Sequence, residues 1–238
     1  STNTTHAQRF SKIVPSLKFV FANKNPRSSI TKYLQWKTFL INEQDLLFTR
    51  DTVNQVDVIT YPTKSRYVNQ LQFVIENNRV LYPYKGALQV EQGKGFARVS
   101  FTGNYFFNYA KGGGMDVRLF AGKFFYLGDK TFINQFETGR YHLNMTGPKG
   151  EEDYTYSNYF IGRNEFEKFS SQQIMIRDGG FKVRTDYLSN KIGKTDDWLA
   201  AANFTSTIPK ALFPFKLPLR VFVDIGTYAE AWKKNAPT

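Results

Sequence analysis

The chain of 238 residues contains no cysteine and only two histidines. The absence of cysteine excludes disulfide bridges, thiolate catalysis and cysteine-ligated metal sites. Neither His6 nor His142 begins an HExxH motif or belongs to a His–Glu cluster, and neither has the motif of a Ser–His–Asp arrangement. We therefore predict no catalytic, cofactor-binding or metal site in this chain, and we expect His142 to be an ordinary side chain on the polar side of its segment.

Long apolar runs are also missing, since no stretch approaches the 18 or more apolar residues of a membrane-spanning helix. The strands of a membrane β-barrel need only about 9–11 residues each, with alternating apolar and polar positions. The hydrophobic fraction is 41% and the aromatic fraction 17%, yet the mean hydropathy is −0.44. This combination is typical of strands that alternate strictly.

Alternation with a period of two dominates the sequence and is clearest at 95–109. One set of positions there is apolar or aromatic, and the other holds most of the polar side chains, among them Arg98, Ser100 and Asn104. Strands of globular proteins usually have about 5–6 residues. A run of this length is long enough to cross a bilayer at a tilt.

Similar patterns predict about ten or eleven strands and no amphipathic helix. Glycine-rich connectors, such as Gly93-Lys94-Gly95 and 111–114, predict tight hairpin turns. Longer loops are expected at about 43–65 and 178–197. We predict one domain over residues 1–238, an all-β, antiparallel, up-and-down transmembrane β-barrel that forms part of a larger barrel. The other predicted strands are 17–22, 31–41, 67–77, 84–91, 115–119, 140–145, 153–161, 172–177, 198–208 and 218–228.

The contents of the two strand faces favour a membrane barrel over a soluble one. The polar face mixes opposite charges, which can pair and be hydrated in an enclosed lumen, and we predict that Arg98, Asp116, Arg118 and Arg220 face that lumen. The apolar face has aromatic residues towards strand ends, as interfacial girdles do. Lys123 falls on the apolar face by parity, which predicts either a bulge at Gly122 or a lysine that reaches the interface. A soluble, lipocalin-type ligand-binding barrel is an alternative that these two faces do not favour. The predicted girdle residues are Tyr67, Tyr105, Tyr109, Phe125 and Tyr228.

The net charge of +12 is compatible with binding to nucleic acid or anionic lipid, or with a basic lumen and basic loop ends. Basic residues recur singly along nearly every segment and form no single run, which favours the second interpretation. We predict no nucleic-acid partner.

Several long strings resemble the C-terminal barrel of outer-membrane gluzincin-type (zinc aminopeptidase-like) metallopeptidases. They include 30–49 (ITKYLQWKTFLINEQDLLFT), 71–95, 117–131 and 141–164, and the similarity continues through 174–198 and 217–232 (LPLRVFVDIGTYAEAW). The resemblance implies an upstream extracytoplasmic domain that carries the zinc and the HExxH motif, neither of which these residues supply. It also implies a barrel that extends beyond both ends of this sequence.

A second resemblance is to the late part of BamA-like assembly-factor barrels. It rests on Gly179-Gly180-x-x-Val183-Arg184, on 203–209 and on the string 221–226 (VFVDIG). In such barrels a loop arginine folds into the lumen and pairs with a wall carboxylate, which implies the pair Arg184 and Asp224 here. The sequence departs from that pattern at 185–187, where Thr-Asp-Tyr replaces a glycine-aromatic pair.

Together these features predict a barrel of the bacterial outer membrane that anchors a metallopeptidase-like extracytoplasmic domain. The alternative is a BamA-like assembly or translocation barrel, or a transport pore. The expected partners are outer-membrane lipid and lipopolysaccharide, and other subunits of outer-membrane complexes are candidates. An upstream HExxH would favour the first function, and repeated periplasmic transport domains would favour the second.

Overall fold

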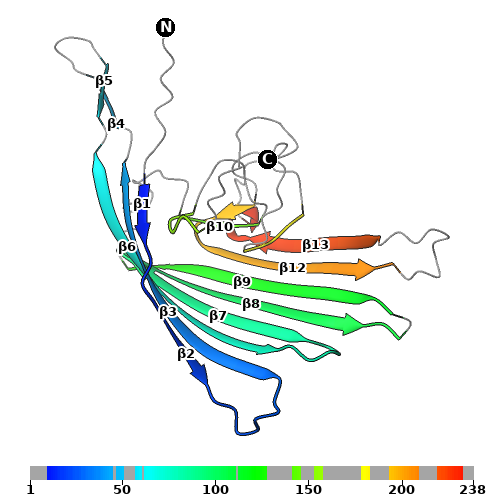
Figure 1. The fold of residues 1–238 in the computed structure, drawn as a ribbon. Helices are drawn as coiled ribbons and strands as arrows, with labels where there is room; N and C mark the ends of the chain where they lie inside the picture. Colours follow the sequence, from blue (N-terminus) through cyan, green and yellow to red (C-terminus); the bar gives the residue numbers. More distant parts are fainter. Residues whose placement is uncertain are drawn as a thin grey trace.

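The computed structural model describes residues 10–44, 47–50, 57–60, 62–110, 112–127, 141–145, 153–157, 178–182, 193–208 and 219–232. The fold is all-β, with one large antiparallel sheet of consecutive strands (Figure 1). The sheet contains β1 (Phe10–Ile13), β2 (Ser16–Phe21), β3 (Ile30–Gln44), β6 (Thr63–Asn77), β7 (Tyr84–Gly93), β8 (Phe96–Asn108), β9 (Gly114–Tyr126), β12 (Trp198–Thr207) and β13 (Arg220–Tyr228).

Two small pairs of strands lie outside this sheet. β4 (Leu47–Arg50) pairs with β5 (Asp57–Thr60), and β10 (Leu143–Asn144) pairs with β11 (Lys194–Thr195). A short 3₁₀ helix, η3 (Ala229–Trp232), follows β13. No helix in the described part of the chain is long and apolar enough to span a membrane.

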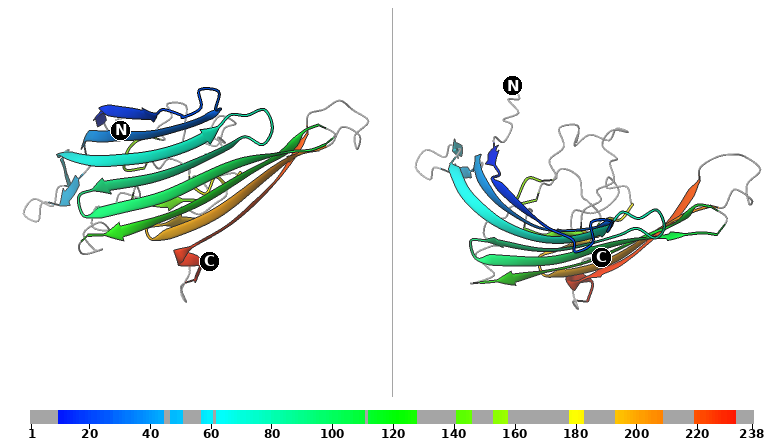
Figure 2. Two further views of the ribbon diagram at one scale, coloured as in Figure 1. Left: turned by 90° about the horizontal axis from the view of Figure 1, so that it is seen from below. Right: turned by 60° about the horizontal axis from the view of Figure 1, so that its bottom comes forward.

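The strand order is β1-β3-β6-β7-β8-β9-β12-β13, with β2 also on β3. Each pairing keeps one register along its whole length, so side chains alternate between two faces without a break. The described sheet is a curved trough and is not closed, since β1 and β2 form one edge and β13 the other (Figure 2). Closure, which the meander pattern predicts, is therefore not found within the described residues.

The first edge consists of β1 and β2 in line along β3. Their pairings follow one register, Ile13 with Leu40 and Ser16 with Lys37. Pro15 separates them because it lacks an N–H to donate, although its carbonyl accepts from the backbone N–H of Thr38 at 3.1 Å. Proline is tolerated here because this is an edge position.

The concave face of the sheet, here called the inner face, supports three segments of the connection between β9 and β12. These inner segments are residues 141–145, 153–157 and 178–182. They pack on the sheet through a largely aromatic core, and Gly226 makes room for them, because a Cβ there would lie 2.5 Å from the sulfur of Met145. The core consists of Phe39, Ile41, Val68, Phe96, Phe120, Phe124, Leu143, Met145, Tyr154, Tyr156, Leu199 and Ala201.

The predicted strands that belong to the main sheet are confirmed, and they include 17–22, 31–41 and 198–208, which match β2, β3 and β12. Two other predicted strands, 140–145 and 153–161, do not join that sheet in their described residues. Within 140–145 only the two residues of β10 are strand, and the described part of 153–161, residues 153–157, forms a turn. The predicted strand 172–177 lies outside the described residues. The predicted loop at 43–65 contains β4 and β5.

The outer face, opposite the inner segments, has two charged residues in the nine strands of the main sheet, Lys32 and Lys123. Lys32 lies near the start of β3 and Lys123 near the end of β9, at opposite ends of the sheet. The pairing of β8 with β9 runs without a bulge past Gly122, so Lys123 keeps its outward position, 3.9 Å from Asp197. The prediction that Tyr228 belongs to the aromatic girdle of the apolar face is wrong, because Tyr228 pairs with Leu199 on the inner face.

Candidate functional site: a polar cluster on the inner face

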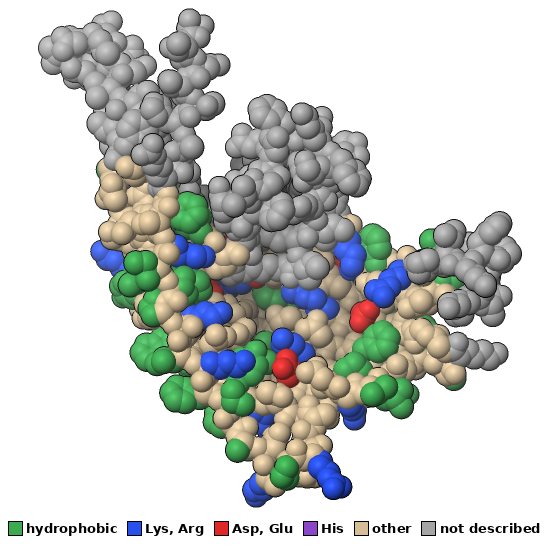
Figure 3. Space-filling model, in the orientation of Figure 1, with side chains coloured by type: hydrophobic (Ala, Val, Ile, Leu, Met, Phe, Trp, Pro, Cys, Tyr) green, Lys and Arg blue, Asp and Glu red, His purple; other side chains and the backbone are tan. Residues whose placement is uncertain are grey.

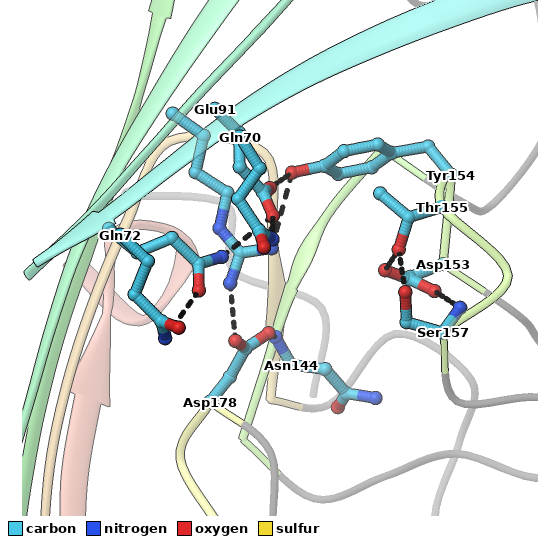
Figure 4. Close-up of polar contacts among 11 residues, drawn as sticks. Gln70, Gln72, Glu91, Asn144, Asp153, Tyr154, Thr155, Ser157 and Asp178 are labelled. Carbon is cyan, nitrogen blue, oxygen red and sulfur yellow. Dashed lines mark hydrogen bonds and ion pairs between the residues drawn. The ribbon is translucent and has the colours of Figure 1, made fainter. Parts of the chain in front are cut away.

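A buried polar cluster joins the sheet to two of the inner segments (Figure 4). Register places Glu91 of β7 directly opposite Arg98 of β8. Arg98 forms an ion pair with Asp178 and hydrogen-bonds to the hydroxyl of Tyr154 at 3.3 Å, and its Nη1 lies 3.7 Å from Glu91. Tyr154 in turn donates to Glu91. We call Arg98, Glu91, Asp178, Tyr154, Gln70 and Gln89 the Arg98 cluster.

The carboxylates of the Arg98 cluster have several donors each. Gln70 and Gln89 both donate to Glu91 at 2.6 Å, and the backbone N–H of Asn144 donates to Asp178 at 3.1 Å. Arg98 is 2% exposed and Glu91 0% exposed. Buried charges of this kind are tolerated only when they are paired and hydrogen-bonded. The cluster therefore forms only when the inner segments pack against the sheet, because these segments supply Asp178 and Tyr154.

A second attachment lies towards the β1 edge. Arg66 of β6 forms an ion pair with Glu43 of β3 at 3.0 Å, and Glu43 accepts from the hydroxyl of Tyr156 at 2.7 Å. Lys12 of β1 donates to the carbonyl oxygens of Thr155 and Tyr156 at 3.1 and 2.9 Å. The segment 153–157 is thus held by Glu43 of β3 and Lys12 of β1.

The third attachment involves Asp224, which lies on the inner face opposite Asn203. Its carboxylate accepts from the backbone N–H and the ammonium group of Lys182, at 2.7 and 3.1 Å, and from the amide of Asn203 at 3.0 Å. Asn203 also donates to the carbonyl oxygen of Gly179 at 3.0 Å. Asp224 does therefore bind a cation in the segment that follows Gly179-Gly180. That cation is Lys182, and Arg184 lies outside the described residues.

The other residues predicted to face the lumen all lie on the inner face. Arg118 donates to the side-chain oxygen of Asn203 at 3.0 Å. Arg220 approaches Asp116 at 3.9 Å, and both side chains are more than half exposed. Such an exposed pair contributes little to stability.

His142, in the inner segment 141–145, is buried, and its Nδ1 has no hydrogen-bond partner in the described part of the chain. Burial, with help from the nearby Lys194 ammonium, lowers the pKa of His142 from 6.5 to about 4, although Asp178 and Asp153 oppose the shift. His142 is therefore neutral at pH 7. His6 lies outside the described residues, and the described residues contain no group of three or more metal-ligating side chains.

The neutral state of His142 predicts acid sensitivity. Between pH 6.5 and about 4 the unfolded chain binds a proton at this site and the folded chain does not. Folded-state stability should therefore fall as pH drops through this window, by on the order of 3 kcal/mol in total. Melting temperatures measured from pH 7 to pH 4 check this, with His142→Gln as the control. A variant as acid-sensitive as the parent protein would exclude His142 as the cause.

Comparison of the chain with models of known protein families, with curated proteins and with solved structures found no match. Function must therefore be argued from the geometry. The three attachments offer ion pairs and hydrogen bonds that hold the inner segments against the sheet. Sequence reasoning missed the roles of Glu91, Tyr154 and Asp178. A signal existed for Glu91, because the two-residue turn Lys94-Gly95 places it opposite Arg98.

Proposed function

We propose that this sheet is part of the wall of a β-barrel in the bacterial outer membrane, and that it serves as the membrane anchor of a metallopeptidase-like extracytoplasmic domain. The observation that carries the membrane part is the composition of the outer face. Its two charged residues, Lys32 and Lys123, stand near the two ends of the sheet, and large apolar side chains fill the area between them.

The apolar area of the outer face continues across the whole sheet. Soluble monomers rarely expose contiguous apolar patches of more than a few hundred Å². A lipid-facing barrel surface has such an apolar band, and long lysine side chains near its borders can reach the interface. The exposed apolar residues of this face are Ile13, Leu17, Phe19, Phe21, Trp36, Leu40, Tyr67, Leu71, Leu88, Val90, Phe101, Phe107, Leu119, Phe125, Val221, Val223 and Ile225.

The inner face has the opposite character, which supports an enclosed lumen. In the space-filling view, charged side chains of both signs gather in the hollow of the sheet, and hydrophobic ones lie along its left and lower rim (Figure 3). The charged residues of the inner face are Lys12, Lys18, Lys37, Glu43, Lys64, Arg66, Glu76, Lys85, Glu91, Arg98, Asp116, Arg118, Arg220 and Asp224.

One group of polar side chains on the outer face forms a chain of hydrogen bonds. Thr38 donates to Asn69, Asn69 to Gln92, and Gln92 to the carbonyl of Gly93, at 2.9, 3.1 and 3.1 Å. Each of these side chains therefore has a hydrogen-bond partner on the same face. They lie in the half of β3, β6 and β7 that leads to the end of the sheet marked by Lys123, towards the same border of the apolar area.

The two open edges agree with a wall that is completed by further strands. Unpaired backbone N–H and C=O groups are too costly in hydrocarbon, so only closed barrels of strands span membranes. Within this proposal, both the β1–β2 edge and β13 pair with additional strands. The role as a peptidase anchor rests on the sequence resemblance. The second candidate, a BamA-like assembly barrel, is favoured by the inward-folded segment at 178–182 and its contact with Asp224.

Cell fractionation tests the proposal. Expressed with an export signal in a Gram-negative host, the protein should sediment with the outer membrane and resist extraction by alkaline carbonate. Membranes that contain the complete parent polypeptide should also show chelator-sensitive aminopeptidase activity. Recovery of the protein in the soluble fraction would contradict the membrane part. A carbonate-resistant protein without the peptidase activity would leave the assembly barrel as the better function.

A further inference from the structure

Two cavities on the inner face share one row of side chains. The first cavity, of about 330 Å³, is lined mainly by polar residues of β7, β8 and β9, and the second, of about 220 Å³, adjoins it towards the turn between β6 and β7. Lys85, Asn104 and Arg118 line both. Register places Asn104 opposite Lys85 on one side and opposite Arg118 on the other. The row therefore consists of a cation on β7, an amide on β8 and a cation on β9.

The row has unused donors. Lys85 lies 3.4 Å from Glu76, but its side chain is 48% exposed, so the ammonium has further N–H groups directed to solvent. Within the described residues, Arg118 makes one hydrogen bond, from Nη1 to Asn203, and the amide of Asn104 makes none. Neighbouring strands lie about 4.8 Å apart, so the backbones of β7 and β9 are roughly 10 Å apart. A small anion seated over Asn104 can accept from both cations.

Four carboxylates lie near this row. Glu76 lies 3.4 Å from Lys85, and Asp116, which lines the second cavity, lies 3.9 Å from Arg220. Asp178, which lines the first cavity, pairs with Arg98, and Asp224 pairs with Lys182. The first cavity adds amide and hydroxyl groups from Gln72, Gln89, Ser100 and Thr102. Arginine and lysine with neighbouring amides are the groups that recognise carboxylate and phosphate oxygens in proteins.

We propose that Lys85, Asn104 and Arg118 form a binding site for a small oxyanion, a carboxylate or a phosphate group, on the inner face. The site goes beyond the proposed membrane anchor and does not require it, because the inner face has the same geometry whatever covers the outer one. Its ligand is of a size that fits a cavity of about 330 Å³, such as the carboxylate end of a short peptide or a phosphorylated small molecule.

Isothermal titration calorimetry of the purified, folded protein tests the site, in aqueous buffer or in detergent solution. The probes are inorganic phosphate, an acetylated dipeptide with a free carboxylate, and the same dipeptide as its amide. At least one oxyanion should bind saturably, and the uncharged amide at least tenfold more weakly. Phosphate alone or the peptide carboxylate alone would identify the source of the oxyanion.

Variants locate the binding. Lys85→Gln and Arg118→Gln should each weaken oxyanion binding at least tenfold, and Lys18→Gln, which removes an inner-face cation of β2 outside both cavities, should leave it unchanged. Melting curves verify folding, and because Lys85 is half exposed, Lys85→Gln still decides the matter if Arg118→Gln misfolds. The absence of saturable binding, or equal binding by Lys85→Gln and the parent protein, would overturn the proposal.

Discussion

Replacement of Arg98 by methionine should destabilise the protein more than any other single change on the inner face. The substitution keeps much of the side-chain length but leaves Glu91 and Asp178 without their shared cation. Removing one partner of a buried ion pair costs about 3–5 kcal/mol, because the remaining charge stays buried. For a domain of this size the melting temperature should drop by on the order of 10 °C. The connection between β9 and β12 should also become sensitive to limited proteolysis, because Asp178 and Tyr154 lose their attachment to the sheet.

Two further variants separate the loss of charge from the loss of packing. Arg98→Lys retains the cation but loses the forked donor geometry, and it should lie between the parent protein and Arg98→Met. The triple variant Arg98→Met, Glu91→Gln, Asp178→Asn removes all three charges and should recover part of the stability. If Arg98→Met melts and resists protease like the parent protein, the cluster does not hold the inner segments.

The long strands and their two faces were predictable from the sequence, because alternation with a period of two extends over ten or more residues in most of them. The run at 95–109 is an example, and β8 (Phe96–Asn108) falls within it. The turn Gly93-Lys94-Gly95 also has a local cause, since Gly95 has a φ of 82° and a Cβ on Gly93 would lie 2.5 Å from the ring of Phe96. Local chemistry of this kind can be read one segment at a time.

The inner core was not predictable in the same way. Phe96, Phe120 and Phe124 share the inner face with polar side chains, and their environment depends on segments that lie far away in sequence. Alternation places them on the inner face but gives no indication that Leu143 or Tyr154 covers them. In the described residues of the predicted strands 140–145 and 153–161, only Leu143 and Asn144 are strand, and the apolar residues Leu143, Met145, Tyr154 and Tyr156 pack into this core.

The identity of the cation that binds Asp224 could not be predicted from the sequence, for a different reason. The inward direction of Asp224 followed from parity, and a partner after Gly179-Gly180 followed from the resemblance. Which cation reaches the carboxylate depends on the path of the backbone after Gly180, which has a φ of 62°. Lys182 donates through both its backbone and its side chain, which a motif centred on Arg184 does not anticipate.

The two faces of β8 allow the membrane proposal to be tested with adjacent residues. Phe101 points outward, with 45% of its surface exposed, and Thr102 points inward and lines the larger inner cavity. An arginine on the lipid face near the middle of a bilayer costs about 2–4 kcal/mol, and one in the lumen can be hydrated. Phe101→Arg should therefore be severely destabilised in a bilayer, and Thr102→Arg should be close to the parent protein. Phe101→Leu controls for the loss of the ring.

The most direct measurement is the folded fraction of these variants after reconstitution into phospholipid vesicles across a urea series. We expect the unfolding midpoint of Phe101→Arg to lie well below those of Phe101→Leu and Thr102→Arg, since only this substitution places a charge in hydrocarbon. A protein in which Phe101→Arg folds as well as Thr102→Arg, or in which the inward arginine is the more damaging of the two, would show that lipid does not cover the outer face.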